Sequence, residues 1–177
     1  MLRLFTAIAI PTAIKKQIAA ALVPYPAEKW IPAANWHVTV FFLGNTSPDN
    51  LPLLNRNLQA ITRHTPPFTL QFKQVEARLQ PDRAPMVWIS FYPNEIFTEL
   101  ASLIGEVSGR EPDYDFVPHL TLLRLPNTAK QDAKAKSLAK MHLPPFLLPI
   151  TQIELWQSEQ SENRRIYTAL QKFDLEG

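Results

Sequence analysis

The chain contains the stretch His37-Val38-Thr39-Val40, and a stretch of the same kind recurs as His119-Leu120-Thr121-Leu122. Each opens an apolar run that predicts a β-strand, over residues 37–43 and 119–125. Because side chains alternate across a strand, each histidine shares one face with its threonine, and the residues between and after them face the other way. Each strand therefore presents one imidazole and one hydroxyl on one side and apolar side chains to a core.

The segments around these two strands alternate between strand and helix patterns. Apolar or alternating runs predict further strands over residues 3–10, 68–75, 86–91, 150–157 and 165–173. Apolar residues at helical spacing predict helices over residues 12–22, 48–63 and 96–107, and residues 128–141 form a lysine-rich helix or loop. This mixture indicates an α+β fold. Because no linker or low-complexity segment divides the sequence, residues 1–177 are expected to form a single domain.

Composition excludes several classes of function. The 177 residues include no cysteine, which removes disulfides, thiolate metal sites and cysteine nucleophiles, and suits a cytoplasmic protein. Four glycines and no Gly-Lys-Ser/Thr sequence exclude a P-loop and a dinucleotide fingerprint. No apolar run approaches the length of a membrane span, so no membrane partner is expected. The formal net charge of +2 is too small for general nucleic-acid binding by the whole surface.

The repeated pair of imidazole and hydroxyl groups matches what phosphodiester cleavage requires. A base must activate the nucleophile and an acid must protonate the leaving oxygen, and histidine serves in either role near neutral pH. The hydroxyls of Thr39 and Thr121 can donate hydrogen bonds to the phosphate oxygens. No acidic residues or cysteines cluster with either histidine, so neither a metal nor another cofactor is expected. These residues leave open which histidine is the acid, and also whether both are simply packed, hydrogen-bonded strand residues.

The residues around both motifs resemble a known family. The stretches Asn35-Trp36-His37-Val38-Thr39-Val40-Phe41-Phe42-Leu43-Gly44 and Pro118-His119-Leu120-Thr121-Leu122-Leu123-Arg124 resemble the two motifs of the 2H phosphoesterase superfamily. Within it, the chain is most similar to the bacterial RNA 2′,3′-cyclic phosphodiesterases, also called 2′-5′ RNA ligases, over nearly its whole length. This resemblance implies a bilobal fold: two duplicated β-sheet lobes related by a pseudo-two-fold axis, with helices on the outside and the active-site cleft between the lobes.

The resemblance also implies an activity. This is the metal-independent hydrolysis of RNA 2′,3′-cyclic phosphodiester ends to 2′-phosphomonoesters, with reversible 2′-5′ RNA ligation by the same groups. In the family's usual assignment His37 is the proton donor and His119 the proton acceptor, while Thr39 and Thr121 hold the phosphate. The alternatives are a phosphodiesterase for small cyclic nucleotides or ADP-ribose cyclic phosphate, and a non-catalytic RNA-end binding module. The expected partner is thus such an RNA end or a small cyclic nucleotide, and the protein is expected to be a monomer.

Four further side chains are candidate substrate-binding residues. By strand parity Phe41 shares the face of the first histidine, so it either stacks on a nucleobase or fills the core of its lobe. Its neighbour Phe42 is a second aromatic candidate. Arg124 matches the family's arginine, but strict alternation turns it away from the second histidine unless the strand twists or bulges near its end. Tyr167, in the last predicted strand, is either a substrate-binding or a core residue.

Overall fold

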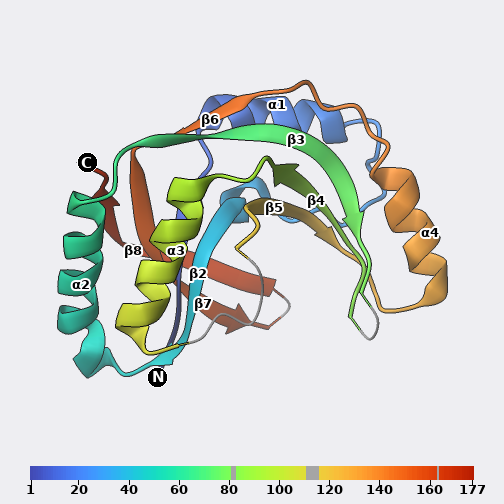
Figure 1. Ribbon diagram of the computed structural model, residues 1–177. Coiled ribbons are helices and arrows are strands. Elements are labelled where there is room, and N and C mark those ends of the chain that lie inside the picture. The colour runs from blue at the N-terminus through green and yellow to red at the C-terminus, as the bar shows by residue number, and fades with distance from the viewer. Residues whose placement is uncertain (81–82, 111–115, 163) are drawn as a thin grey trace.

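The computed structural model describes residues 1–80, 83–110, 116–162 and 164–177 (Figure 1). Within these ranges the strands are β1 (Leu2–Ala9), β2 (His37–Thr46), β3 (Phe68–Arg78), β4 (Met86–Phe91), β5 (His119–Arg124), β6 (Leu147–Ile150), β7 (Gln152–Ser161) and β8 (Arg164–Asp174). The helices there are α1 (Thr12–Leu22), α2 (Leu51–Arg63), α3 (Glu95–Ser108) and α4 (Ala129–Leu138), with short 3-10 turns at Ala33–Asn35 and Pro48–Asn50. The strands form one curled antiparallel sheet in the order β6-β3-β4-β5-β2-β1-β7-β8.

The sheet consists of two halves with the same connectivity. In the first half β1, α1, β2 and α2 follow one another, and in the second half β4, α3, β5 and α4 do so. β7 and β8 extend the first half outward from β1, while β3 and β6 extend the second half from β4. The halves meet between β2 and β5, where Val38 pairs with Leu120. The predicted α+β fold of two duplicated sheet halves is therefore confirmed.

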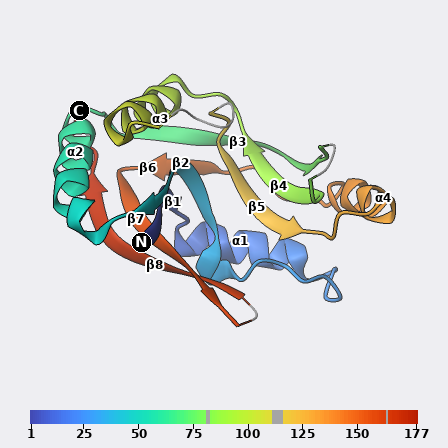
Figure 2. The same ribbon diagram turned by 90° about the horizontal axis from the view of Figure 1, so that it is seen from below.

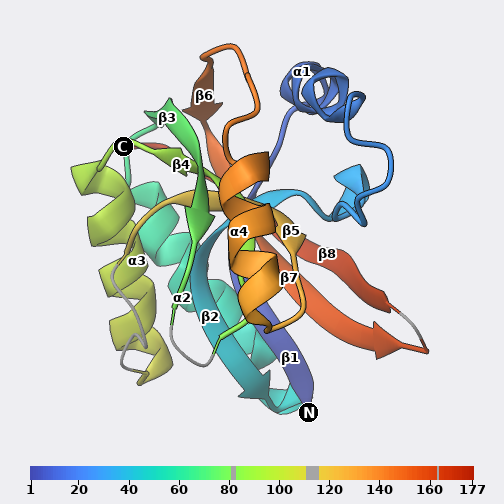
Figure 3. The same ribbon diagram turned by 90° about the vertical axis from the view of Figure 1, so that its right-hand side faces the viewer.

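The helices pack on the outside of the curled sheet. α2 and α3 lie side by side, in contact with β8 and β2 respectively, and α4 lies against β3 and β4 (Figures 2 and 3). Every helix buries apolar side chains in the cluster that also contains Val38 and Leu120, and examples are Ile18, Leu58, Phe97 and Ala135. Because Val38 and Leu120 directly follow the two histidines, the histidines project from the opposite face of the sheet.

A one-residue bulge interrupts β2 inside its motif. Along β1, Thr6 pairs with Phe41 while the next residue, Ala7, pairs with Thr39, so Val40 is the extra residue. A bulge reverses the facing of the side chains that follow it. A second register shift makes Leu43 another extra residue, between Phe42, which pairs with Phe5, and Gly44, which pairs with Leu4. The parity expected from the sequence therefore holds for His37 to Thr39, fails at Phe41 and Phe42, and is restored from Gly44.

β5 carries a bulge at the equivalent position. The adjacent residues Val87 and Trp88 of β4 pair with Leu123 and Thr121, so Leu122 is the extra residue. In both motif strands the bulged residue is thus the third after the histidine. The two halves of the sheet share this irregularity as well as their connectivity.

The remaining differences from the predicted elements lie near the C-terminal end. The predicted strand over residues 150–157 starts too late to include β6, which pairs with β3 at the edge of the sheet. β6 contains Pro149, which has no backbone N–H group, and an edge strand tolerates this loss because one side of it has no strand partner. The segment left open between helix and loop contains α4. Among the described residues no helix is both long and apolar enough to cross a membrane.

Candidate active site

The two motif histidines are held in the same way. Nδ1 of His37 lies 2.7 Å from the carbonyl oxygen of Asn35, and Nδ1 of His119 lies 2.8 Å from that of Val117. Because a carbonyl oxygen only accepts hydrogen bonds, Nδ1 is the donor in each ring. This fixes the tautomer of each neutral imidazole and leaves Nε2 as its basic atom.

The pairing of β2 with β5 sets how the four motif side chains lie relative to one another. Val38 and Leu120, the residues after the two histidines, are direct partners. Because the two strands are antiparallel, this register places His37 opposite Thr121 and Thr39 opposite His119. Direct cross-strand neighbours lie about 5 Å apart and diagonal neighbours about 7–8 Å. The two imidazoles therefore occupy one diagonal and the two hydroxyls the other. The Thr39 hydroxyl also donates to Nε2 of His37 over 3.1 Å.

Three aromatic rings surround the imidazole of His37. The centroids of Phe5, Trp156 and Tyr167 lie 5.0, 5.3 and 5.3 Å from that of His37, and Tyr167 is edge-on at 87°. Phe5 and Trp156 belong to a small apolar cluster separate from the main core. His37 thus sits in an apolar environment on the face of the sheet away from the helices.

This environment changes the acidity of His37. Burial lowers the pKa of His37 from 6.5 to about 4, although the hydrogen bond to the Asn35 carbonyl works in the opposite direction. The positive charges of His119 and Arg124 lower it further, which also shows that these groups lie near His37. His37 is therefore neutral at neutral pH.

The environment of His119 is different. The indole of Trp88 lies against His119, with ring centroids 4.1 Å apart and an angle of 40° between the planes. Burial lowers the pKa of His119, its backbone hydrogen bond raises it, the charges of Arg124 and Arg78 lower it, and that of Glu76 raises it. His119 therefore rests on the indole of Trp88 and has a carboxylate in its surroundings.

The lowered pKa of His37 predicts a pH-dependent stability. The unfolded chain binds a proton at His37 near pH 6.5 whereas the folded chain does so only at about pH 4, so the free energy of unfolding should fall as the pH is lowered through this window. Urea unfolding of the wild type and of His37→Gln at pH 7 and pH 4.5 measures this. The loss should be smaller in the variant, and an equal loss in both proteins would contradict the assignment.

Phe41 does not lie on the histidine face. It is 2% exposed, its ring lies 6.3 Å from that of Phe116, and it packs so close to α3 that a Cβ added at Gly105 would approach it to 3.0 Å. The bulge at Val40 turns its side chain into the core. The predicted shared face of Phe41 with His37 is therefore wrong, and the core alternative holds.

The same bulges bring the residue five positions after each histidine onto the histidine face. On β2 this residue is Phe42, which is 50% exposed and lies 5.9 Å from the ring of Phe5. On β5 it is Arg124, whose charge acts on both imidazoles. Strict alternation would turn Arg124 away from His119, and the bulge at Leu122 turns it back to the histidine face. Tyr167 is half-buried, lies beside His37, and interacts electrostatically with Arg124.

Neighbouring strands supply aromatic residues to the site that the motifs themselves did not indicate. Trp88 comes from β4, Trp156 from β7 and Phe5 from β1. A Gln-x-Glu pattern occurs on the two strands that flank these halves of the sheet, as Gln74-Val75-Glu76 on β3 and as Gln152-Ile153-Glu154 on β7, although it also recurs at Gln157-Ser158-Glu159 and Gln160-Ser161-Glu162. Glu76 and Glu154 accept hydrogen bonds from the two tryptophans. Only the pairing of the strands connects this second repeat with the histidines.

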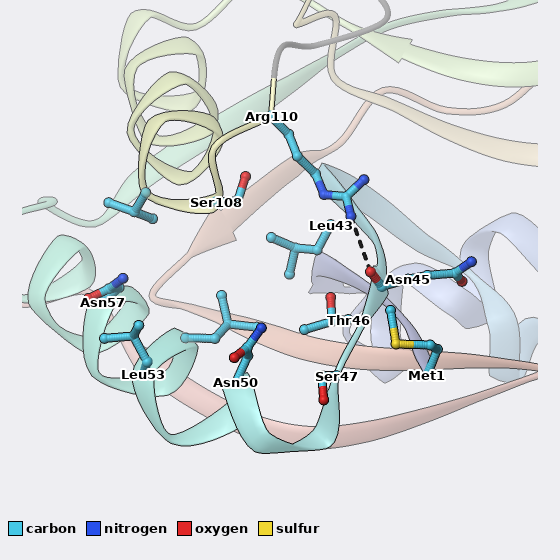
Figure 4. Close-up of a pocket in the computed structure, with 12 residues that line it drawn as sticks. Met1, Leu43, Asn45, Thr46, Ser47, Asn50, Leu53, Asn57, Ser108 and Arg110 are labelled. Carbon is cyan, nitrogen blue, oxygen red and sulfur yellow. Dashed lines mark hydrogen bonds between the residues drawn. The ribbon is translucent and has the colours of Figure 1, made fainter.

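A pocket of about 310 Å³ lies elsewhere, at the far end of β2 between α2 and the end of α3 (Figure 4). Its lining includes Asn45, Leu53 and Arg110, and the Arg110 guanidinium donates to the carbonyl oxygen of Asn45 over 3.1 Å. It contains no histidine and none of the predicted site residues. Within the described ranges, no three His, Asp or Glu side chains are placed to hold a metal ion. Among the described residues, the histidines on β2 and β5 therefore stay the candidate acid–base groups.

Comparison with known proteins agrees with this geometry. The family model described as the 2′-5′ RNA ligase superfamily matches residues 10–162. The chain is 28% identical to an RNA 2′,3′-cyclic phosphodiesterase of Thermus thermophilus, covering 99% of this chain and 91% of the relative. It is 27% identical to a protein of the same name from Methanocaldococcus jannaschii, covering 97% and 100%. The crystal structure of E. coli LigT complexed with NADP+ superposes with a TM-score of 0.77 at 27% identity, covering 99% of both chains. The chain therefore belongs to the 2′-5′ RNA ligase superfamily of 2H phosphoesterases.

Proposed function

We propose that this protein hydrolyses the 2′,3′-cyclic phosphate at an RNA end to a 2′-phosphate, with the two motif histidines as acid and base. The observation that carries the proposal is the pair of imidazoles on one face of β2 and β5, each with Nδ1 bound to a carbonyl, so that Nε2 is the basic atom of each ring. Nε2 of His37 accepts a hydrogen bond from the Thr39 hydroxyl, which the substrate would displace. Two threonine hydroxyls and Arg124 lie on the same face. The names of the relatives support the choice of substrate.

In the proposed reaction, water attacks phosphorus as His119 takes its proton, and His37 gives a proton to the departing 3′-oxygen. The bound phosphodiester carries a negative charge, which favours protonation of an imidazole in contact with it. Because burial lowers the pKa of His37, its protonated form is a strong acid for the leaving oxygen. Glu76 stabilises the imidazolium that forms on His119. These differences support His37 as the donor and His119 as the acceptor.

The phosphate and the nucleoside would be bound by different residues. Thr39 and Thr121 would donate hydrogen bonds to the non-bridging oxygens, and Arg124 would balance the charge that grows on them. Phe42 and Tyr167 would contact the nucleobase, since both present rings beside His37 and aromatic side chains stack on unpaired bases. The same groups would catalyse 2′-5′ ligation if the 5′-hydroxyl of a second RNA took the place of water. His119 would take the hydroxyl proton, the 5′-oxygen would bond to phosphorus, and His37 would protonate the departing 3′-oxygen, which leaves a 2′-5′ phosphodiester.

The proposal is tested by product analysis. The purified protein is incubated with EDTA and an oligonucleotide that ends in a 2′,3′-cyclic phosphate, and the new end should be a 2′-phosphate. A 3′-phosphate product, or loss of turnover in EDTA, would contradict the proposed mechanism. Equal or faster turnover of 2′,3′-cyclic mononucleotides or ADP-ribose cyclic phosphate would instead favour a small-molecule substrate, and binding without turnover would favour a non-catalytic module.

The two adjacent phenylalanines provide a matched pair of variants. Phe42→Ala should raise KM for the oligonucleotide several-fold and leave the unfolding free energy within about 1 kcal/mol, because an exposed ring adds little to the core. Phe41→Ala should lower the unfolding free energy by about 3–5 kcal/mol with little change in KM at low temperature. Steady-state kinetics and urea unfolding distinguish the two. A raised KM in Phe41→Ala alone would reverse the assignment.

The location and oligomeric state remain part of the proposal. The cysteine-free composition supports a cytoplasmic location. Both imidazoles, both hydroxyls and Arg124 come from one chain, which supports a monomer as the active form. If the monomer is the active form, activity per mole of protein should stay constant on dilution. This should hold even across any concentration range in which sedimentation detects self-association.

A further inference from the structure

Two glutamates occupy equivalent places in the two halves of the sheet. Glu76 lies on β3 opposite Trp88 of β4, and Glu154 lies on β7 opposite Ala7 of β1. In each half, one strand separates the glutamate from the motif strand. Each glutamate also follows a glutamine two positions earlier on the same strand. The pseudo-two-fold relation therefore extends beyond the two histidines to this pair of glutamates.

The carboxylate of Glu76 is held at both oxygens. Nε1 of Trp88 donates to one oxygen over 2.7 Å, and Nε2 of Gln74 donates to the other over 2.8 Å. Trp88 is 8% exposed, so its N–H group requires a partner within the protein. The guanidinium of Arg78 lies 5.6 Å from the centroid of the same indole. The indole against which His119 rests is thus fixed by a charge-assisted hydrogen bond.

The other half repeats this arrangement on the His37 side. Nε1 of Trp156 donates to one oxygen of Glu154 over 2.7 Å, and Nε2 of Gln152 donates to the other over 3.2 Å. Lys172 forms an ion pair with the same carboxylate at 3.3 Å. Glu154 is only 4% exposed. Its indole partner is one of the three rings around His37.

The energetics of these positions favour a role beyond packing. Burying a carboxylate costs free energy unless the charge is paired and hydrogen-bonded, and an apolar residue in the same place would avoid that cost. Both halves nevertheless place a carboxylate there, with one glutamine and one tryptophan donor. The tryptophan stands on the neighbouring strand β4 in one half and on the glutamate's own strand β7 in the other. A tryptophan whose N–H group is bound in this way cannot turn its ring without taking that donor from a carboxylate, which is half-buried at Glu76 and buried at Glu154.

We propose that Glu76 and Glu154 are positioning residues, which fix the indoles of Trp88 and Trp156 and through them the orientation of His119 and His37. The proposal rests on the proposed function, since it assigns these residues to the two histidines of that reaction. Glu76 has the stronger electrostatic effect, because its charge reaches His119, whereas the charge of Glu154 is paired with Lys172. Removing either glutamate should disturb the histidine of its own half and leave the other unchanged.

The test compares Glu76→Ala, Glu76→Gln and the control Glu99→Ala, which changes an exposed glutamate on α3. Glu76→Ala should lower kcat about tenfold with KM within twofold, because a small displacement of a reacting group affects the transition state more than binding. Its His119 ring resonances should titrate at lower pH than in the wild type, and those of His37 should not move. Glu76→Gln keeps an acceptor for Trp88, so it should recover most of kcat while the titration of His119 stays lowered. Glu154→Ala should affect the resonances of His37 and not those of His119.

The NMR measurements need no substrate, which separates this proposal from the proposed function. If the wild type has no activity but the His119 ring of Glu76→Ala loses its NMR contacts with the Trp88 indole while Glu76→Gln keeps them, the positioning role stands and the proposed function fails. If Glu76→Ala remains folded with kcat and the His119 titration of the wild type, the glutamate only stabilises the fold and the positioning role is overturned. Should Glu76→Ala fail to fold, Glu76→Gln decides, because an unchanged His119 titration in that variant is also contradictory.

Discussion

Replacing either His37 or His119 with alanine is expected to lower kcat for an RNA 2′,3′-cyclic phosphate end by about 10³-fold, as loss of a general acid or base typically does. KM should change much less, because Thr39, Thr121 and Arg124 remain to bind the phosphate. The double variant should be little slower than the single variants, since the acid and the base act in one step. Single-turnover kinetics of the oligonucleotide with excess enzyme measure the chemical step directly.

The chain provides matched controls for this experiment. His64 and His142 are exposed and lie outside the motifs, so His64→Ala and His142→Ala should keep the wild-type rate. Circular dichroism and urea unfolding should show that the active-site variants remain folded, since the imidazoles lie outside the main core. Undiminished turnover in His37→Ala or His119→Ala would eliminate the two-histidine mechanism.

Replacing Arg124 with methionine is expected to lower kcat/KM about 100-fold, which is the usual cost of removing one group that stabilises transition-state charge. Arg124→Lys should recover less than the full rate, because an ammonium group cannot form two parallel hydrogen bonds with a phosphate. The methionine variant should also raise the pKa of His37 and His119, since the charge of Arg124 lowers both. Steady-state kinetics and ring-proton titrations test the two effects independently.

Arg56, exposed on α2, serves as the control for loss of one positive charge. Arg56→Met should leave kcat/KM within twofold at moderate salt, because screening removes most of the effect of a distant charge. If Arg124→Met and Arg56→Met behave alike, Arg124 acts only through the overall field of the protein and not in the site.

The sequence by itself determined the facing of the side chains inside each motif, from the histidine to the threonine. The faces of His37 and Thr39, and of His119 and Thr121, follow from strand alternation over three residues, which no neighbouring strand has to assist. The repetition of the motif also indicated a duplicated architecture. The amphipathic helices could be located because their apolar spacing is local, as in α1 and α3.

Tertiary structure alone decided which of the residues after each motif lie on the histidine face. The bulges at Val40 and Leu122 appear only in the pairing with β1 and β4, and they exchange the roles of Phe41 and Phe42 and return Arg124 to the histidine face. A bulge is a property of two strands in register, so periodicity along one strand cannot reveal it.

The supports of the histidines also required the folded sheet. Trp88 and Trp156 reach the imidazoles from strands that are remote in sequence, and Glu76 and Glu154 hold these indoles from β3 and β7. The repeated Gln-x-Glu could be read in the sequence, but its connection with the histidines depends on strand order. Local alternation fixes the face of the strand from which a side chain projects, whereas long-range pairing of strands fixes the residues that it contacts. The acidity and orientation of the two histidines depend on these contacts.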